Sequence, residues 1–199
     1  MIRLRYRLTP LLLALGISMP FIAPPSLGAS DSALSAAAHE YFTDVELVTQ
    51  NGDSVRLYSD LLKRKVVVIN TFFGTCTGSC PRMSGLLAGL QDRLGNQLGK
   101  DVFLLSFSVD PAIDTPEKLK QYAEQYHARP GWLFLTGKKE NVDFALSKLG
   151  PRLARREDHM TVFTVWNDRT GLIEKVPFSP ASTAESLHSI IESVLNDKE

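Results

Sequence analysis

Two almost uninterrupted apolar runs constrain the fold of this chain more than any other feature. They are Val66–Ile69, which is entirely β-branched, and Phe103–Val109. Runs without polar alternation are typical of strands that are buried on both faces of a sheet. Between them, residues 81–98 carry apolar side chains at helical spacing. Strand, helix and strand in this order predict a mostly parallel sheet with helices packed on its faces.

Further elements are predicted on both sides of this unit. Upstream, two segments of strand periodicity at 45–48 and 55–57 flank Asn51–Gly52, a strong hairpin-turn signal. Downstream, we expect a helix capped by Thr115, a strand at 132–135, a helix at 140–149, a hairpin at 160–176 and a closing helix whose capping box begins at Ser182. The sequence therefore predicts an α/β, thioredoxin-like fold: a mixed central sheet flanked by helices, with an added N-terminal β-hairpin.

The first 29 residues differ from the rest of the chain. Arg3, Arg5 and Arg7 precede a short apolar stretch, and small residues follow it. This is the pattern of an export signal. We expect 1–29 to be a signal peptide or an N-terminal membrane anchor, 30–40 a linker, and 41–199 the thioredoxin-like domain. The protein is then exported to the periplasm, where it is soluble or anchored to the inner membrane.

The charge balance bears on the partners. The chain has 22 basic and 22 acidic residues, so its formal net charge is zero. A nucleic-acid partner calls for a basic surface, and this balance argues against one. Membrane contact is expected only through an uncleaved leader.

Both cysteines of the chain lie where a buried strand ends and a helix begins, the place where open α/β sheets carry their sites. They are Cys76 and Cys80. If the segment is helical, the two side chains share a face. Two such sulfurs can close a disulfide or bind one soft metal ion. A purely structural disulfide remains an alternative, although so short a loop would stabilise the fold little.

One of the four histidines has a position that suits a third ligand. His159 immediately precedes an apolar strand, whereas His39, His127 and His188 are expected to be solvated or packed. Two thiolates and one imidazole form a soft donor set that favours Cu(I) and tolerates Cu(II). A structural zinc site calls for four ligands, and the chain has no third cysteine.

Four segments, in order, resemble motifs of the Sco/SenC/PrrC family. Residues 71–81 contain its C-x-x-x-C-P, and residues 108–117 are similar to its S-V-D-P-x-x-D-T-P. Residues 131–137 match its G-W-x-x-L-T-G, and 158–159 match its D-H segment. The ordered set is more specific than any one motif alone.

The resemblance implies a copper metallochaperone that assists assembly of the CuA centre of cytochrome c oxidase. Its ligands would be Cys76, Cys80 and His159, and its partner would be oxidase subunit II or another copper protein. A periplasmic thiol reductant or copper donor would be a further partner. Asp110 and Asp114 would support the ligands or face the partner; alternatively, Asp114 only helps to cap the next helix.

Two other functions stay open at this point. Some family members act as thiol-disulfide oxidoreductases or redox sensors on target cysteines, which would make Cys76 and Cys80 a redox-active catalytic pair. A peroxidase of the same fold superfamily is the third hypothesis, and peroxide turnover would reveal it. The short, arginine-rich stretch between Leu149 and Asp158, together with Met160 and Thr164, departs from the family pattern and bears on target choice.

Overall fold

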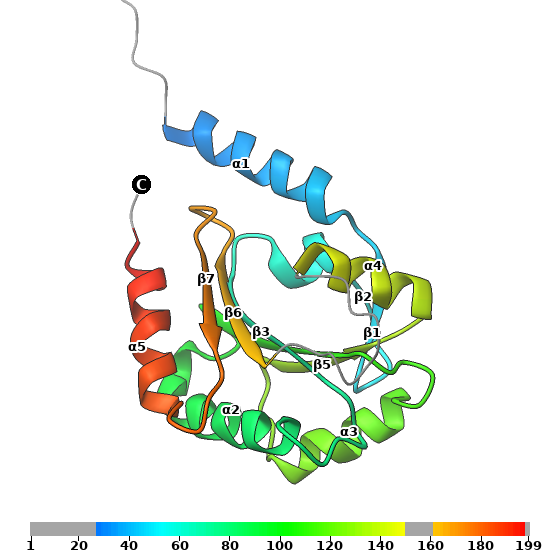
Figure 1. Cartoon of the computed structure of the whole chain (residues 1–199). Coiled ribbons are helices and arrows are strands. Elements are labelled where there is room, and N and C mark those ends of the chain that lie inside the picture. Colours follow the sequence, from blue (N-terminus) through cyan, green and yellow to red (C-terminus); the bar gives the residue numbers. More distant parts are fainter. Residues whose placement is uncertain (1–26, 150–160, 198–199) are drawn as a thin grey trace, which may run out of the picture.

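A single mixed sheet of seven strands forms the centre of the domain (Figure 1). The computed structural model of the chain describes residues 27–149 and 161–197. The strand order across the sheet is β2-β1-β5-β4-β3-β6-β7. The strands are β1 (Glu46–Thr49), β2 (Ser54–Arg56), β3 (Val66–Phe72), β4 (Val102–Ser108), β5 (Trp132–Thr136), β6 (Val162–Asn167) and β7 (Ile173–Pro177).

The two apolar runs form the middle of this sheet, as predicted. β3 pairs in parallel with β4, and β4 pairs in parallel with β5. On the other side, β6 is antiparallel to β3 and forms the expected hairpin with β7. The upstream strands β1 and β2 pair antiparallel, and β1 joins the sheet beside β5. The mixed, helix-flanked sheet is therefore confirmed.

Helices cover both faces of the sheet (Figure 1). α2, α3 and α5 pack on one face, and α1, a π-helical turn η1 and α4 pack on the other. Each face has its own hydrophobic core. The helices are α1 (Leu27–Phe42), η1 (Leu57–Leu62), α2 (Cys80–Leu94), η2 (Gly95–Gln97, a 3-10 turn), α3 (Pro116–Gln125), α4 (Lys139–Leu149) and α5 (Ala184–Leu195).

The expected linker at 30–40 is helical, because it lies inside α1. Residues 33–38 include four alanines, the residue with the highest intrinsic helix propensity. Residues 1–26 lie outside the described part of the chain, so the leader remains a prediction. None of the helices in the described ranges combines the length and the apolar character that a membrane crossing requires.

The N-terminal cap of α3 is the predicted residue, whereas that of α5 differs from the prediction. Thr115 caps α3, and its hydroxyl accepts a hydrogen bond from Lys118 N. At α5, however, the cap is Thr183 rather than Ser182. Thr183 Oγ1 accepts from Ser186 N at 3.1 Å, and the Ser186 side chain closes the box. Ser182 is instead engaged in the preceding turn, where its hydroxyl accepts from Ser179 N.

Candidate functional site

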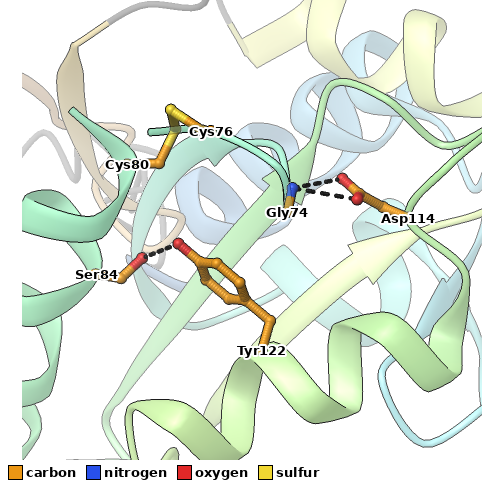
Figure 2. The surroundings of a disulfide bond; sticks show 6 residues. All are labelled: Gly74, Cys76, Cys80, Ser84, Asp114 and Tyr122. Atoms are coloured by element: carbon orange, nitrogen blue, oxygen red, sulfur yellow. Dashed lines mark hydrogen bonds between the residues drawn. A yellow bond between two sulfur atoms is a disulfide. The ribbon is translucent and has the colours of Figure 1, made fainter. Parts of the chain in front are cut away.

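The two cysteines lie at the carboxyl end of β3, in the turn that leads into α2 (Figure 2). Cys80 is the first residue of the helix, whereas Cys76 lies in the turn before it. The helical arrangement considered for this segment is therefore wrong, because the helix begins only at the second cysteine. The two residues nevertheless meet: they form a disulfide, with their Cα atoms 6.0 Å apart.

The two sulfurs differ in access to solvent. Cys80 is fully buried in the core, whereas Cys76 is partly exposed. A reagent or a partner's thiolate would therefore reach Cys76 first. Cys80 lies at the start of α2, where the helix dipole stabilises a thiolate.

Asp114 connects the cysteine-bearing turn to the segment between β4 and α3 (Figure 2). Gly74 N donates to both of its carboxylate oxygens at 3.1 Å. The hydroxyl of Ser108, the last residue of β4, donates to Asp114 Oδ2 at 2.5 Å. The carboxyl group is therefore engaged by the turn and by β4, and the hydroxyl of Thr115 provides the cap of α3.

Burial raises the pKa of Asp114, and its hydrogen bonds from Ser108 and Gly74 act in the opposite direction. The residue is 1% exposed, so water contributes little to the solvation of its carboxyl group. The turn also has a steric requirement at Gly74. A Cβ atom there would lie 2.8 Å from Asp114 Oδ1, which is closer than a Cβ contact allows.

The other predicted aspartate is linked to Asp114 through Ser108. Asp110 N donates to Ser108 Oγ at 3.0 Å, and the same hydroxyl donates to Asp114. Asp110 is half-buried. The two aspartates thus belong to one hydrogen-bonded turn beside the cysteines.

Tyr122, a buried residue of α3, also belongs to this region. The Tyr122 and Ser84 hydroxyls are 3.1 Å apart, which ties α3 to α2 one helical turn beyond Cys80 (Figure 2). Burial raises the pKa of Tyr122, so it stays a neutral phenol. The helical spacing of Ser84 from Cys80 was the available signal, but a serine in a helix says little by itself.

The predicted third ligand, His159, lies outside the described residues. The other three histidines have different surroundings: His39 approaches Asp44, His188 approaches Glu192, and His127 lies in the turn after α3 with φ +50°. Within residues 27–149 and 161–197, no cluster of three or more histidine, cysteine or acidic side chains is arranged to hold a metal ion. The described part of the site therefore provides two sulfur donors.

Comparison with known proteins gives a consistent result. The SCO1/SenC family model matches residues 34–195. The SCO1 protein homolog of Bacillus subtilis is 37% identical over 100 residues, covering 49% of this chain and 51% of that protein. The chain thus spans about half the length of the first curated relatives that it matches.

Solved structures share the fold. BsSco, described as a member of the Sco family of cytochrome c oxidase assembly proteins with a disulfide switch, is 28% identical. The match has a TM-score of 0.63 and covers 77% of this chain and 92% of that one. Yeast Sco1 with copper bound has a TM-score of 0.61 at 23% identity over the same shares. The family match, which spans most of the described residues, shows that this chain belongs to the SCO1/SenC family.

Proposed function

We propose that this protein is a copper metallochaperone that assists assembly of the CuA centre of cytochrome c oxidase. The observation that carries the proposal is the placement of Cys76 and Cys80, whose sulfurs are within bonding reach at the end of β3. Membership of a family that includes cytochrome c oxidase assembly proteins supports the same function.

The donor chemistry favours copper as the cargo. Once the disulfide is reduced, Cys76 and Cys80 offer two thiolates to one ion. Adding the imidazole of His159 completes a soft, three-coordinate set, which suits Cu(I) and accommodates Cu(II). The partial exposure of Cys76 would let a target thiolate displace a protein ligand, so the ion passes to the target by ligand exchange.

The compartment belongs to the same proposal. The N-terminal leader would direct the protein to the periplasm, as a soluble or membrane-anchored protein. There, subunit II of the oxidase would be the recipient of the ion. A periplasmic thiol reductant would keep the pair reduced for loading.

A second candidate function, thiol-disulfide exchange, is favoured by the disulfide itself. With the pair reduced, the Cys76 thiolate would attack a target disulfide, forming a mixed disulfide and releasing one target sulfur as a thiolate. Cys80 would then attack the Cys76 sulfur, release the second target thiolate and close the Cys76–Cys80 disulfide, which a periplasmic thiol reductant would reduce again. This order of attack suits the partly exposed Cys76 and the buried Cys80.

Copper stoichiometry tests the leading proposal. Reduced wild-type protein should bind one copper ion, and Cys76→Ser, Cys80→Ser and His159→Ala should each lose tight binding. The control is His188→Ala on α5, which should bind copper as the wild type does. Unchanged binding by His159→Ala would rule out the three-ligand site, and unchanged binding by either cysteine variant would rule out the proposal.

The same variants separate the two functions. Thiol exchange needs both cysteines and not the histidine, so His159→Ala should still reduce a target disulfide if redox chemistry is the main function. If instead copper transfer is the function, His159→Ala should fail to deliver copper to oxidase subunit II while its disulfide still forms. Both measurements use the same purified proteins.

A further inference from the structure

A cavity of about 590 Å³ lies on the sheet face opposite to α2. This volume is in the range of small-molecule pockets, roughly 300–1,000 Å³. Neither cysteine lines it, nor does Asp114, so it is separate from the candidate metal site. Its wall is mostly apolar and comes from α1, η1, β3, α4, β6 and β7; the main apolar contributors are Ala38, Phe42, Leu62, Ile69, Trp166 and Ile173.

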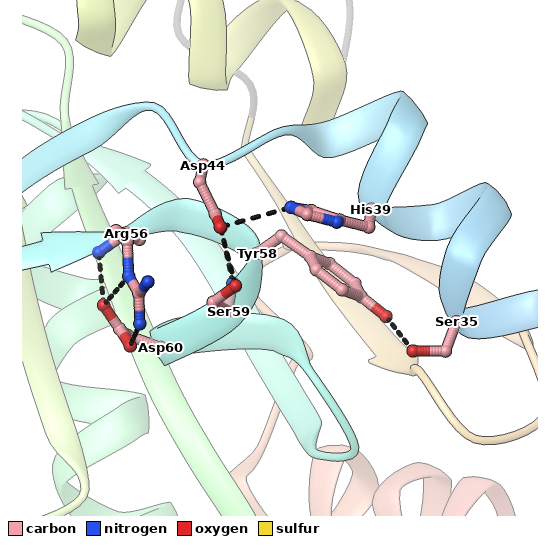
Figure 3. A network of polar contacts seen from close by, with 7 residues as sticks. All are labelled: Ser35, His39, Asp44, Arg56, Tyr58, Ser59 and Asp60. Atoms are coloured by element: carbon pink, nitrogen blue, oxygen red, sulfur yellow. Dashed lines mark hydrogen bonds and ion pairs between the residues drawn. The ribbon is translucent and has the colours of Figure 1, made fainter. Parts of the chain in front are cut away.

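The roof of this cavity is α1, which polar contacts fix to the domain (Figure 3). The Ser35 and Tyr58 hydroxyls are 2.8 Å apart, and the His39 ring stacks on the Tyr58 ring at 5.1 Å between centroids. His39 Nε2 also lies 3.2 Å from Asp44 Oδ2. The roof is therefore attached at several points, yet it leaves space beneath it.

One end of the cavity is positively charged. Lys175 Nζ donates to the carbonyl oxygen of Leu149, the residue after Lys148, at 3.2 Å. Lys148 Nζ lies 4.4 Å above the ring of Tyr41, which is 51% exposed, so this end opens to solvent. Across the described ranges, neither lysine forms an ion pair with a carboxylate.

In the part of the chain that the structure describes, the cavity lining contains one carboxylate, that of Asp168, and other residues of the domain already bind its Oδ2. Asp168 is buried, and its Oδ2 accepts hydrogen bonds from Arg64 N at 2.7 Å and from the Tyr58 hydroxyl at 3.2 Å. Two donors therefore stabilise Oδ2, whereas Oδ1 is buried and has no hydrogen-bond partner among the described residues. The solvent end of the cavity keeps a net positive character from Lys148 and Lys175.

We propose that this cavity binds a long-chain carboxylic acid, with its acyl chain in the apolar interior and its carboxylate at Lys148 and Lys175. Each CH₂ of an acyl chain that leaves water for this apolar interior adds to the affinity. The two ammonium groups supply the complementary charge at the end of the cavity beside Tyr41, where a polar head would reach solvent. This inference is independent of copper binding.

Tryptophan fluorescence of the full chain tests the proposal with dibrominated stearate as the quenching probe. Trp166 lines the cavity, whereas Trp132 is buried in the core on the other face. We expect saturable quenching that Trp166→Phe removes and Trp132→Phe preserves. The methyl ester of the same acid, which lacks the charge, should bind at least about tenfold more weakly.

Two variants decide the outcome. Lys148→Glu with Lys175→Glu should weaken binding at least about tenfold, and the matched control Lys120→Glu, on the exposed side of α3, should not. Ala38→Phe should fill the cavity and abolish binding; if that variant does not fold by circular dichroism, the lysine pair decides. Equal binding of acid and ester, or unchanged binding by the lysine pair, would overturn the proposal.

A final experiment distinguishes binding of a free acid from binding to a membrane surface. Vesicles of phosphatidylglycerol present an anionic surface without a free acid. Sedimentation of the protein with these vesicles, combined with no quenching by the monomeric acid, would mean that the lysines bind a surface, and the cavity proposal would be wrong. Quenching by the acid without sedimentation supports it.

Discussion

At the scale of single residues, Asp114 links the cysteine-bearing turn to the end of β4. Its carboxylate accepts from Gly74 N and from the Ser108 hydroxyl while it is buried. We predict that Asp114→Ala lowers the free energy of unfolding by about 1–3 kcal/mol, because it leaves buried donors without an acceptor. Urea denaturation monitored by circular dichroism measures the change.

The control for this prediction is a carboxylate on the surface of α4. Asp143→Ala removes an exposed carboxylate on α4, whose partner is Lys139, and should change the stability by less than about 0.5 kcal/mol. Equal effects of the two alanine variants would show that Asp114 does not hold the turn. Asp114→Asn should lie between the two, because an amide can still accept from Gly74 and donate to Ser108.

The sequence predicted only some of the contacts between the site residues. The importance of Cys76 and Cys80 followed from their position after a buried strand, and the structure brings them together. The contact between Gly74 and Asp114 spans 40 positions and was not predictable, because it depends on how the turn approaches the next strand. His159 lies beyond the described residues, so its role remains a prediction.

At the scale of elements, η1 is held by a charged pair at its start (Figure 3). Asp60 Oδ2 accepts from Arg56 N at 2.8 Å, and the guanidinium donates to both carboxylate oxygens. The Arg56 side chain and backbone lower the pKa of Asp60 from 3.8 to about 2. Since the folded-state pKa is depressed, this pair stabilises the fold above pH 3.8 and loses its effect as the pH falls towards 2.

We therefore predict a pH-dependent effect for Asp60→Asn. The variant should be less stable than the wild type at pH 6, and the difference should shrink as the pH falls from 4 to 2. Thermal unfolding across this range measures it. A difference that is constant with pH would mean that the charge on Asp60 does not contribute.

The cap of α5 gives a second prediction at this scale. Thr183→Ala should destabilise the protein by about 1 kcal/mol, since it removes the acceptor for Ser186 N. Ser182→Ala, at the position that the sequence pattern favoured, is the matched comparison and should cost less. If guanidinium denaturation shows a larger loss of stability for Ser182→Ala than for Thr183→Ala, Ser182 is the cap, as the sequence pattern predicted.

The element boundaries show where sequence reasoning was limited. A Ser–Thr pair before a helix offers two caps, and only the backbone decides between them: Thr183 is extended, with φ −126° and ψ 157°. The start of α2 was similarly ambiguous, because a turn of helix and an irregular turn both bring Cys76 near Cys80. Short-range patterns predict that an element exists better than they predict its first residue.

At the scale of the whole molecule, the topology followed from hydrophobic periodicity. The runs at β3 and β4 become parallel central strands because both of their faces are buried by helices. The helix α1 was not predicted, since its alanine-rich segment has little apolar patterning and was interpreted as a linker. Its position is set by tertiary contacts from Ser35 and His39, which no local pattern reveals.

The last prediction concerns how the whole fold responds to reduction of the disulfide. The Cys76–Cys80 bridge closes a loop with a sequence separation of four, so its effect on the unfolded chain is small. We predict that reduction lowers the free energy of unfolding by no more than about 2 kcal/mol and leaves the folded structure intact. The copper binding proposed above needs the reduced pair and therefore depends on this tolerance.

Urea denaturation with and without a phosphine reductant, in the presence of a copper chelator, measures this effect. The double variant Cys76→Ser with Cys80→Ser is the control, because its stability should not respond to the reductant. Loss of the native circular dichroism spectrum on reduction would contradict the prediction. It would show that the bridge maintains the fold, which favours the alternative of a structural disulfide.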